Sequence, residues 1–480
     1  MNELGLFLFA LLVMLGLLFL VTILVFVVVL QYKRKYPEKS YTIATLNVAL
    51  TPLRMFNIGP YKYGEITIEK VMKLVSRETK LNDFGDLAFV ERYRFVNTLP
   101  SFKEHQLTNL GYIMAITELR MMISRRLKLV DYLKNNPVVL QISAADPVFV
   151  FGLGRSGTTF LHRLLSLDPT VRSPKLWELV NPVPEVKDGA PQVLFDADCE
   201  KRKEFVRKRI EERKLMGDDG LEKYHEVGHD LPEECLFGLS DEIPTTFHYL
   251  YFTITNWFEL RSKKIINAED LVQAYLYYKR LLQLLSFQIG DTKGEKRWVL
   301  KCPMHVFMIQ QLAIAFPDAK LVWAHRHPQP TVSSLCSLLY TMRGIYFDNA
   351  KLEKKIVGEK MLNIAEKCLT QAPKDIEKSG LPCAHVLYEN LVADPVGTVK
   401  KVYDELGFDY TPAYDSALQS YLEENRRQRE ETKAMLAKKT GQKKAVLHEH
   451  RPEDFGIPAT ALNEGVFADY IKRYNIKSDK

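Results

Sequence analysis

The sequence has few of the features that mark a disulfide-bonded or glycosylated extracellular protein. Its 480 residues include six cysteines, scattered without a regular spacing. No Asn-x-Ser/Thr sequon follows the apolar run near the N-terminus. Both absences favour a cytosolic environment for most of the chain. Internal repeats and low-complexity tracts are also missing.

A recognisable metal site is lacking as well. His225 and His229 are four residues apart with acidic neighbours, a spacing that can hold zinc. Residues 225–229, His-Glu-Val-Gly-His, fit the H-E-x-x-H pattern, but no third ligand lies at a plausible spacing, and Gly228 and Pro232 oppose the long helix that this pattern needs. We therefore expect no metal cofactor.

What the chain does have is ample material for a globular core, because 46% of its residues are hydrophobic and 26% are charged. Its net charge of +7 suits an anionic membrane surface or an anionic cofactor, and ordinary surface lysines explain it equally well. We expect no nucleic-acid partner, and the sequence does not indicate an oligomeric state.

The N-terminal apolar run predicts a membrane anchor. Residues 4–30 carry no charge, and a helix of this length extends about 40 Å, enough to cross a bilayer. The run is too long for the apolar part of a signal peptide and lacks a small-residue cleavage site. Glu3 precedes it, and Lys33, Arg34 and Lys35 follow it. The positive-inside rule therefore places the rest of this single-pass protein in the cytosol.

The most informative stretch is residues 148–165. Residues 148–151 form an apolar, β-branched run typical of a buried strand, a turn with three glycines follows, and a helical apolar period begins at Phe160. A glycine-rich turn that leads into a helix presents free backbone N–H groups and binds phosphate. Ser156, Thr158 and Thr159 add hydroxyl donors and can cap the helix.

This loop is close to a Walker A motif but differs from it in its cation. Gly152 and Gly157 have the required spacing, yet Thr158 stands where the lysine belongs, and Arg155 supplies a positive charge earlier in the loop. A structural turn without a ligand remains an alternative reading of the glycines alone.

From residue 147 onward, strands and helices are expected to alternate. Strands are predicted at residues 148–151, 297–301, 320–325 and 385–388, with helices after each. This order predicts an α/β fold with a P-loop-like parallel sheet flanked by helices. Arg155, Lys301, Arg326 and Tyr388 lie at or just past strand ends, where ligands bind in such sheets, so we expect them to form one site.

Three parts of the chain are therefore predicted. Residues 1–39 form the transmembrane anchor and its basic flank, residues 40–146 a helical segment that packs on the core, and residues 147–480 the α/β domain.

Several motifs resemble those of sulfotransferases that use 3′-phosphoadenosine 5′-phosphosulfate (PAPS). Residues 154–165, Gly-Arg-Ser-Gly-Thr-Thr-Phe-Leu-His-Arg-Leu-Leu, are similar to the 5′-phosphosulfate loop of the Gly-Arg-Ser/Thr-Gly-Thr-Thr branch. Residues 301–305 match Lys-Ser-Pro-x-His, and residues 448–456 resemble a C-terminal segment that would close over the donor. Many membrane-anchored members of this family face the Golgi lumen, so the resemblance implies the ER or Golgi and opposes the charge rule on orientation.

The resemblance implies a set of donor-binding residues. These are Arg155, Ser156, Gly157, Thr158 and Thr159 at the phosphosulfate, Arg326 and Ser334 at the 3′-phosphate, and Phe160 and Tyr388 near the adenine. His327 departs from the usual Arg-Asp-Pro of the second motif. Phe160 and Tyr388 could equally be core residues, and Arg326 could be part of a structural ion pair.

Catalysis by such an enzyme needs charge stabilisation and a base. Arg155 and Lys301 would stabilise the leaving phosphate, without a metal ion. His305 is the first candidate for the base that deprotonates an acceptor hydroxyl, although cytosolic members carry theirs at the position of Pro303. Rival carboxylates are Glu178, Glu233 and Glu234, and a purely structural role for His305 is also open.

The predicted function is therefore that of a sulfotransferase that acts on a hydroxyl of a lipid, sterol-like or carbohydrate acceptor. A P-loop kinase or NTPase is one alternative, but it would need a lysine beside Thr159 and an acidic strand end for magnesium. A membrane-anchored scaffold with an inactive site is the other, and the presence of Arg155, Lys301 and Arg326 argues against it.

Overall fold

The structure is a computed structural model that describes residues 3–35, 40–104, 106–144, 146–186, 192–215, 227–348, 352–440 and 451–477. His225 and the first three residues of the segment 448–456 lie outside these ranges.

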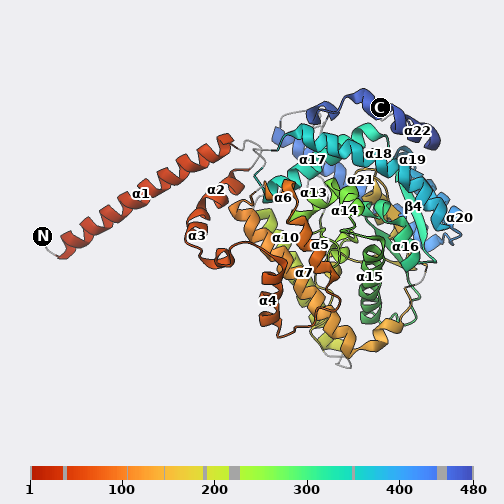
Figure 1. Cartoon of the computed structure of the whole chain (residues 1–480), viewed down its shortest axis with the longest axis horizontal. Coiled ribbons are helices and arrows are strands. Elements are labelled where there is room, and N and C mark those ends of the chain that lie inside the picture. The colour runs from red at the N-terminus through yellow and green to blue at the C-terminus, as the bar shows by residue number, and fades with distance from the viewer. Residues whose placement is uncertain are drawn as a thin grey trace.

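The structure contains a five-stranded parallel sheet. Its strands are β1 (Val148–Phe151), β2 (Val171–Arg172), β3 (Arg297–Lys301), β4 (Lys320–His325) and β5 (Cys383–Leu387), in the order β2-β3-β1-β4-β5. In Figure 1, β4 lies on the side of the body away from α1 (Glu3–Lys35). β1 lies between β3 and β4, with Val150 opposite Lys301 on one side and Val322 on the other. The predicted parallel α/β sheet is confirmed, β2 is an additional strand, and Tyr388 begins a helix instead of ending β5.

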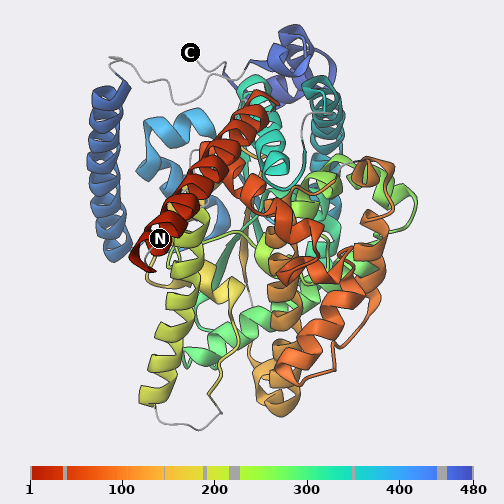
Figure 2. The ribbon, with the colours of Figure 1, turned by 90° about the vertical axis from the view of Figure 1, so that its left-hand side faces the viewer.

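Successive side chains along a strand point to opposite sides of the sheet. Because consecutive residues of β1 are all apolar, both faces of the sheet are apolar. Phe149, Phe151 and Trp323 face one large core, whereas Val148 and Val150 face a smaller one. The larger core includes side chains of α7 (Asn109–Asn135), α15 (Ala268–Gln288), α16 (Ile309–Ala315), α17 (Pro328–Tyr346) and α18 (Lys354–Ser379); the smaller includes those of α8 (Thr158–Leu165), α20 (Pro395–Leu406) and α21 (Pro412–Thr440). In Figure 2, α21 stands at the outer edge of the body.

The remaining helices surround this frame. They are α2 (Tyr41–Ala49), α3 (Thr51–Met55), α4 (Ile68–Thr79), α5 (Ala88–Val96), α6 (Pro100–Lys103), α9 (Leu176–Val180), α10 (Gln192–Leu215), α12 (Leu236–Leu239), α13 (Phe247–Thr255), α14 (Trp257–Ser262), α19 (Tyr388–Ala393) and α22 (Gly465–Tyr474), with 3₁₀ turns η1 (Gly59–Tyr63), η2 (Pro137–Gln141), η3 (Pro303–Phe307), η4 (Pro452–Phe455) and η5 (Ala459–Asn463).

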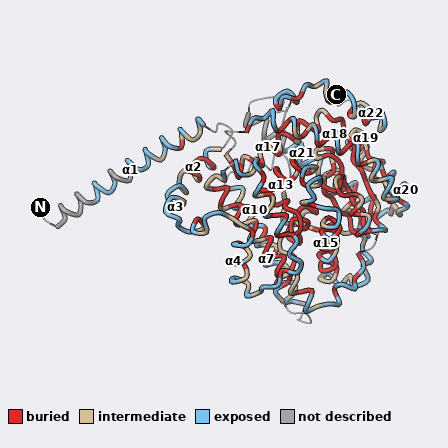
Figure 3. The backbone as a smooth tube through the Cα atoms, in the orientation of Figure 1, coloured by how far each residue is buried: buried red, intermediate tan, exposed pale blue. Residues whose placement is uncertain are grey.

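The helical segment before the sheet shares the larger core with it (Figure 3). Buried ion pairs reinforce this packing. Arg92 of α5 contacts Glu242 at 2.5 Å and Asp270 of α15 at 2.8 Å, and Arg125 of α7 pairs with Asp241. Removing one partner would leave a buried charge uncompensated, so these contacts fix α5 and α7 against the core.

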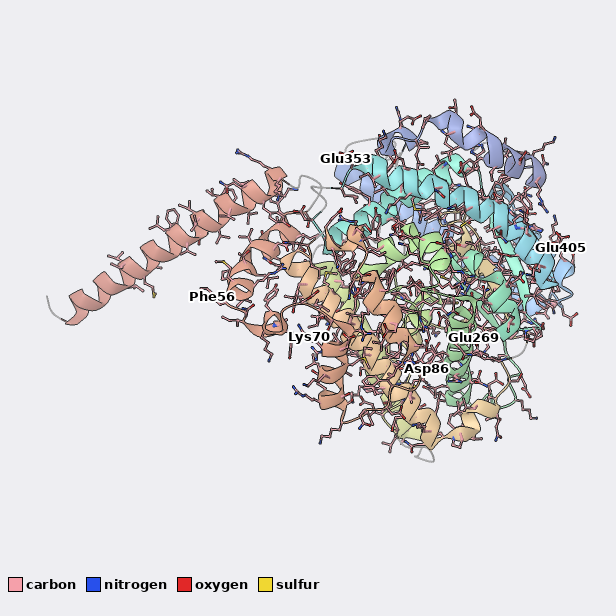
Figure 4. The ribbon with its side chains drawn as sticks, viewed as in Figure 1. Phe56, Lys70, Asp86, Glu269, Glu353 and Glu405 are labelled. Atoms are coloured by element: carbon pink, nitrogen blue, oxygen red, sulfur yellow. The ribbon has the colours of Figure 1, made fainter. Side chains whose placement is uncertain are left out.

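The first helix, α1 (Glu3–Lys35), projects from the body (Figures 1 and 3). Among the described residues it is the one helix long and apolar enough to cross a membrane, judged by length and composition. At its foot, the Lys35 ammonium lies 3.5 Å from the Asp348 carboxylate, two residues past the end of α17. Figure 4 shows Phe56, which follows α3, on the same side of the body as α1, and Glu405 of α20 on the opposite side.

Candidate active site

The loop between β1 and α8 takes the phosphate-binding form that the sequence predicts. It requires glycine at two positions. A Cβ on Gly152 would lie 2.4 Å from the carbonyl oxygen of Ala324 in β4, so a side chain cannot fit there. Gly157 has φ +88° directly before the first turn of α8, a backbone conformation that other residues rarely adopt. The loop therefore lies close to the neighbouring strand and directs the N-terminus of α8 toward its open side.

Arg155 is held in this loop in a strained conformation. Its φ of +76° is unusual for a residue with a side chain, and such strain persists only when neighbouring contacts compensate for it. Its Nε donates to Ser334 Oγ at 3.2 Å, and an Arg326 guanidinium nitrogen donates to its carbonyl oxygen at 3.1 Å. The structure thus brings together Arg155, Arg326 and Ser334, which come from two distant motifs.

Tyr388 joins this group, but Phe160 has a different environment. The Arg326 guanidinium lies 4.1 Å from the centre of the Tyr388 ring, and that ring also packs against Gly157. Phe160 is partly buried against the smaller core, and the Arg429 guanidinium lies 5.7 Å from its ring centre. Stacking of an adenine on that face of Phe160 would require Arg429 to move.

Lys301, at the end of β3, connects the loop to an acidic residue. Its side chain is fully buried, and its ammonium lies 2.6 Å from Glu234 Oε1 and 3.4 Å from Thr159 Oγ1. The backbone N–H of Cys235 donates to the Lys301 carbonyl at 2.9 Å, which places Glu234 beside the strand end. Lys301 is therefore a buried cation compensated by one carboxylate, next to the anion-binding loop.

The residues present fit an anionic group at this loop. The Ser156 hydroxyl is buried and has no hydrogen-bond partner among the described residues, and a buried hydroxyl without a partner is costly. Thr158 and Thr159 face the same space as Arg155. A phosphosulfate would satisfy these donors. No group of three or more metal-ligating side chains occurs among the residues the structure describes.

A cavity of about 660 Å³ opens beside the loop. Gly154, Arg155, Thr158, Thr159, Glu233 and Glu234 form its polar end. Most of the remaining wall is aliphatic or sulfur-containing, from α7, α10, α12, α13, α17 and α18, and includes Met121, Ile210, Leu236, Leu250, Leu335, Leu339, Met342 and Ile364. Sequence reasoning did not identify these residues, because their helical apolar period is the same as that of an ordinary core.

His305 does not belong to the lining of this cavity. It is fully buried, with Nδ1 2.7 Å from the Tyr275 hydroxyl and its ring against the edge of Phe149. Burial, reinforced by the charge of Lys301, lowers the pKa of His305 to about 3. This placement does not support the predicted role of His305 as the base, because His305 is not among the residues that line the cavity and a pKa of about 3 makes its ring a weak proton acceptor.

The three rival carboxylates differ in whether they line the cavity. Glu178 accepts from the Lys175 backbone N–H at 2.9 Å and from Arg172 at 2.5 Å, and it is absent from the cavity wall. These contacts give it a structural role at the start of α9. Glu233 and Glu234 both line the cavity, so the structure retains these two as candidates for the base.

The buried histidines predict a specific sensitivity to acid. Burial also lowers the pKa of His162 to about 3, whereas an unfolded histidine titrates near 6.5. Below about pH 6.5 the unfolded chain therefore binds protons that the folded chain does not. We expect each of these histidines to lower the free energy of unfolding by about 1.4 kcal/mol per pH unit down to pH 4. His305→Gln should reduce that slope in urea titrations; an NMR titration of His305 between pH 5 and 8 would contradict the argument.

The fold and the loop define an α/β protein with a glycine-rich anion site between its central strand and first sheet helix. The chain belongs to the sulfotransferase family, whose sequence model matches residues 147–412. Membership of this family indicates that the chain is a sulfotransferase.

Individual relatives agree with this family. The chain is 25% identical over 323 residues, 64% of its length and 74% of the relative's, to the omega-hydroxy-beta-dihydromenaquinone-9 sulfotransferase Stf3 of Mycobacterium bovis. The fold resembles crystal structures of sulfotransferase STF9 from Mycobacterium avium, with TM-score 0.66, 23% identity and coverage of 86% and 98% of the two chains, and of STF1 from Mycobacterium tuberculosis, with TM-score 0.63, 22% identity and coverage of 84% and 99%.

Proposed function

We propose that this protein transfers a sulfuryl group from PAPS to a hydroxyl of a lipid or sterol-like acceptor. The main observation behind the proposal is that a single cavity has an anion-binding loop at one end and a largely apolar wall elsewhere. One end holds the anion-binding loop and Glu234, which pairs with the buried Lys301, and most of the other lining residues are aliphatic, methionine or phenylalanine.

The donor would be held by residues of the two motifs that meet at Arg155. The loop from Arg155 to Thr159 suits the phosphosulfate, and Arg326 with Ser334 suits the 3′-phosphate, since arginine binds phosphate through charge-assisted hydrogen bonds. When bound, PAPS supplies an activated sulfuryl group on a phosphate leaving group. Thr158 occupies the Walker lysine position, which disfavours a kinase or NTPase.

Residues of the chain itself would then position the acceptor and remove the proton from its hydroxyl. The Glu234 carboxylate lies at the polar end of the cavity, 2.6 Å from the Lys301 ammonium, where it can take the proton of an acceptor hydroxyl. Once Glu234 carries that proton, Lys301 remains as the cation beside Thr159, where it stabilises negative charge on the leaving phosphate. Arg155 does the same from the loop.

The apolar wall supports a lipid or sterol-like acceptor over a carbohydrate. A carbohydrate would leave many hydroxyls without partners against methionine, leucine and isoleucine side chains. The relative Stf3 is named for an omega-hydroxylated menaquinone, an apolar molecule with a terminal hydroxyl. The foot of α1 lies beside the end of α17, which lines the cavity, so an acceptor from the bilayer would have a short path.

The donor is tested by calorimetry on the full chain in detergent or nanodiscs. Titration with 3′,5′-adenosine bisphosphate should give binding without magnesium, and ATP should give none. Tight, magnesium-dependent binding of ATP would overturn the proposal. The acceptor class is tested by incubating the protein with sulfur-labelled PAPS and separated lipid and glycan fractions, in which label should enter the lipids.

For location, we propose an endomembrane protein, in the ER or Golgi, with its catalytic part in the cytosol. Lys33, Arg34 and Lys35 after the apolar run support this orientation. A sequon introduced in the exposed turn after α4, by Lys80→Asn and Asn82→Thr, should therefore remain unglycosylated in cells; asparagine tolerates the φ of +60° that Lys80 has there. A shift in mass that is sensitive to a glycosidase would show a lumenal domain and contradict the charge argument. A sequon added before residue 3 is the control, since it should be glycosylated.

A further inference from the structure

One carboxylate in the apolar part of the cavity has no role in the transfer of the sulfuryl group. Glu118 of α7 lines the cavity, and its side chain is 19% exposed. The imidazole Nδ1 of His248, in α13, lies 3.1 Å from Glu118 Oε2, and the Tyr346 hydroxyl of α17 donates to Oε1. Three helices thus fix the position of one acidic group in the wall.

Within the part of the chain that the structure describes, this carboxylate is not paired with a permanently charged side chain. Among the described residues no arginine or lysine lies within salt-bridge distance of Glu118, in contrast to the buried pairs Arg92–Glu242 and Lys301–Glu234. Each carboxylate oxygen can accept two hydrogen bonds, so the two contacts leave acceptor capacity facing the cavity. An ionised group beside an apolar wall is costly unless a donor satisfies it, so a ligand that carries a donor would be bound preferentially here.

The position of Glu118 relative to the anion-binding loop follows from α17. One face of this helix lines the cavity from Thr331 to Met342. Leu335 packs on Gly154 of the loop, and Tyr346 lies three turns further on. Eleven residues at 1.5 Å per residue, less the backward lean of the tyrosine side chain, separate the loop from Glu118 by roughly 10–16 Å.

We propose that Glu118, positioned by His248 and Tyr346, binds a second hydrogen-bond donor of the acceptor. The preferred acceptor is then an apolar molecule with a hydroxyl at each end, roughly 10–16 Å apart. One hydroxyl lies at Glu234 and the anion-binding loop, and the other at Glu118. This inference rests on the proposed function, because it specifies the acceptor of the same site.

The probes are alkane-1-ols and the matching α,ω-alkanediols, from octane to hexadecane. Their affinities for the full chain in nanodiscs are measured by displacement of a fluorescent fatty alcohol. A hydrogen bond to a charged group should make the diol bind about tenfold more tightly than the alcohol of equal length at one optimal length. Partitioning into the lipid cancels when the diol-to-alcohol ratio is compared between wild type and variant.

Variants separate recognition from a purely structural role. Glu118→Met fills the same space without an acceptor and should lower the diol-to-alcohol ratio about tenfold or more relative to wild type, and Glu118→Gln should lower it less while keeping an acceptor for Tyr346. Thr117→Val is the matched control, because the Thr117 hydroxyl lines the cavity but already donates to Ile113 at 2.7 Å. A structural role would weaken both probes equally.

The outcomes are distinct. A diol preference that Glu118→Met abolishes and Thr117→Val preserves supports the inference, even if no sulfate is transferred; in that case the proposed function fails alone. Equal binding of both probes to wild type, a preference that survives Glu118→Met, or binding of neither probe overturns the inference. Sulfation of both alcohols with equal KM would overturn it and leave the proposed function standing.

Discussion

Glu234→Gln is expected to lower kcat by about 10²- to 10⁴-fold, while binding of 3′,5′-adenosine bisphosphate changes little. The variant keeps the shape of the side chain and an oxygen that can accept from Lys301, which lies 2.6 Å from Glu234 Oε1. It removes the negative charge that can take a proton from the acceptor hydroxyl. The loss therefore falls on the chemical step. Single-turnover measurements with pre-bound PAPS check this directly.

Two variants serve as controls for this result. Glu233→Gln alters the neighbouring carboxylate of the same cavity wall and should lower kcat much less. His305→Gln, which retains a partner for Tyr275, should leave kcat near the wild-type value because His305 lies outside the cavity. If His305→Gln abolishes the chemical step in a folded protein while Glu234→Gln does not, the histidine is the base.

Arg326→Ala is expected to raise the KM for PAPS by about 10- to 100-fold with a smaller change in kcat. The 3′-phosphate has the same charge in the ground state and the transition state, so a residue that binds it contributes uniform binding. Part of the effect on kcat should be indirect, because Arg326 also donates to the carbonyl of strained Arg155 at 3.1 Å. Initial rates over a range of PAPS concentrations separate the two constants.

Arg297→Ala provides the matched control for Arg326. Arg297 is the first residue of β3, at the end of the strand opposite Lys301, and it pairs with Asp146 at 2.9 Å. Its removal should leave the KM for PAPS unchanged. A loss of kcat alone in Arg326→Ala, with unaltered affinity for 3′,5′-adenosine bisphosphate, would assign Arg326 to the chemistry instead of the donor site.

The sequence by itself determined the parallel sheet and the anion-binding loop. Both depend on local properties: the apolar runs of β1, β3 and β4 have lengths typical of buried strands, and the glycines before α8 fix the turn. Parallel strands also align their carboxyl ends, so Lys301 and Arg326 could be placed at the same edge of the sheet without knowledge of any contact. The strand β2 was not predicted, because a segment of two residues has no hydrophobic periodicity. The start of α19 at Tyr388, directly after β5, was not predicted either.

Only the tertiary structure decided the protonation chemistry and the acceptor cavity. The pKa of His305 depends on its burial against Phe149 and Tyr275, which come from distant parts of the chain. The pairing of Lys301 with Glu234 likewise joins residues far apart in sequence. The cavity is a space between α7, α10, α13 and α17. A helix whose apolar face borders such a space has the same sequence period as one packed in a solid core, so its existence depends on how the helices are placed.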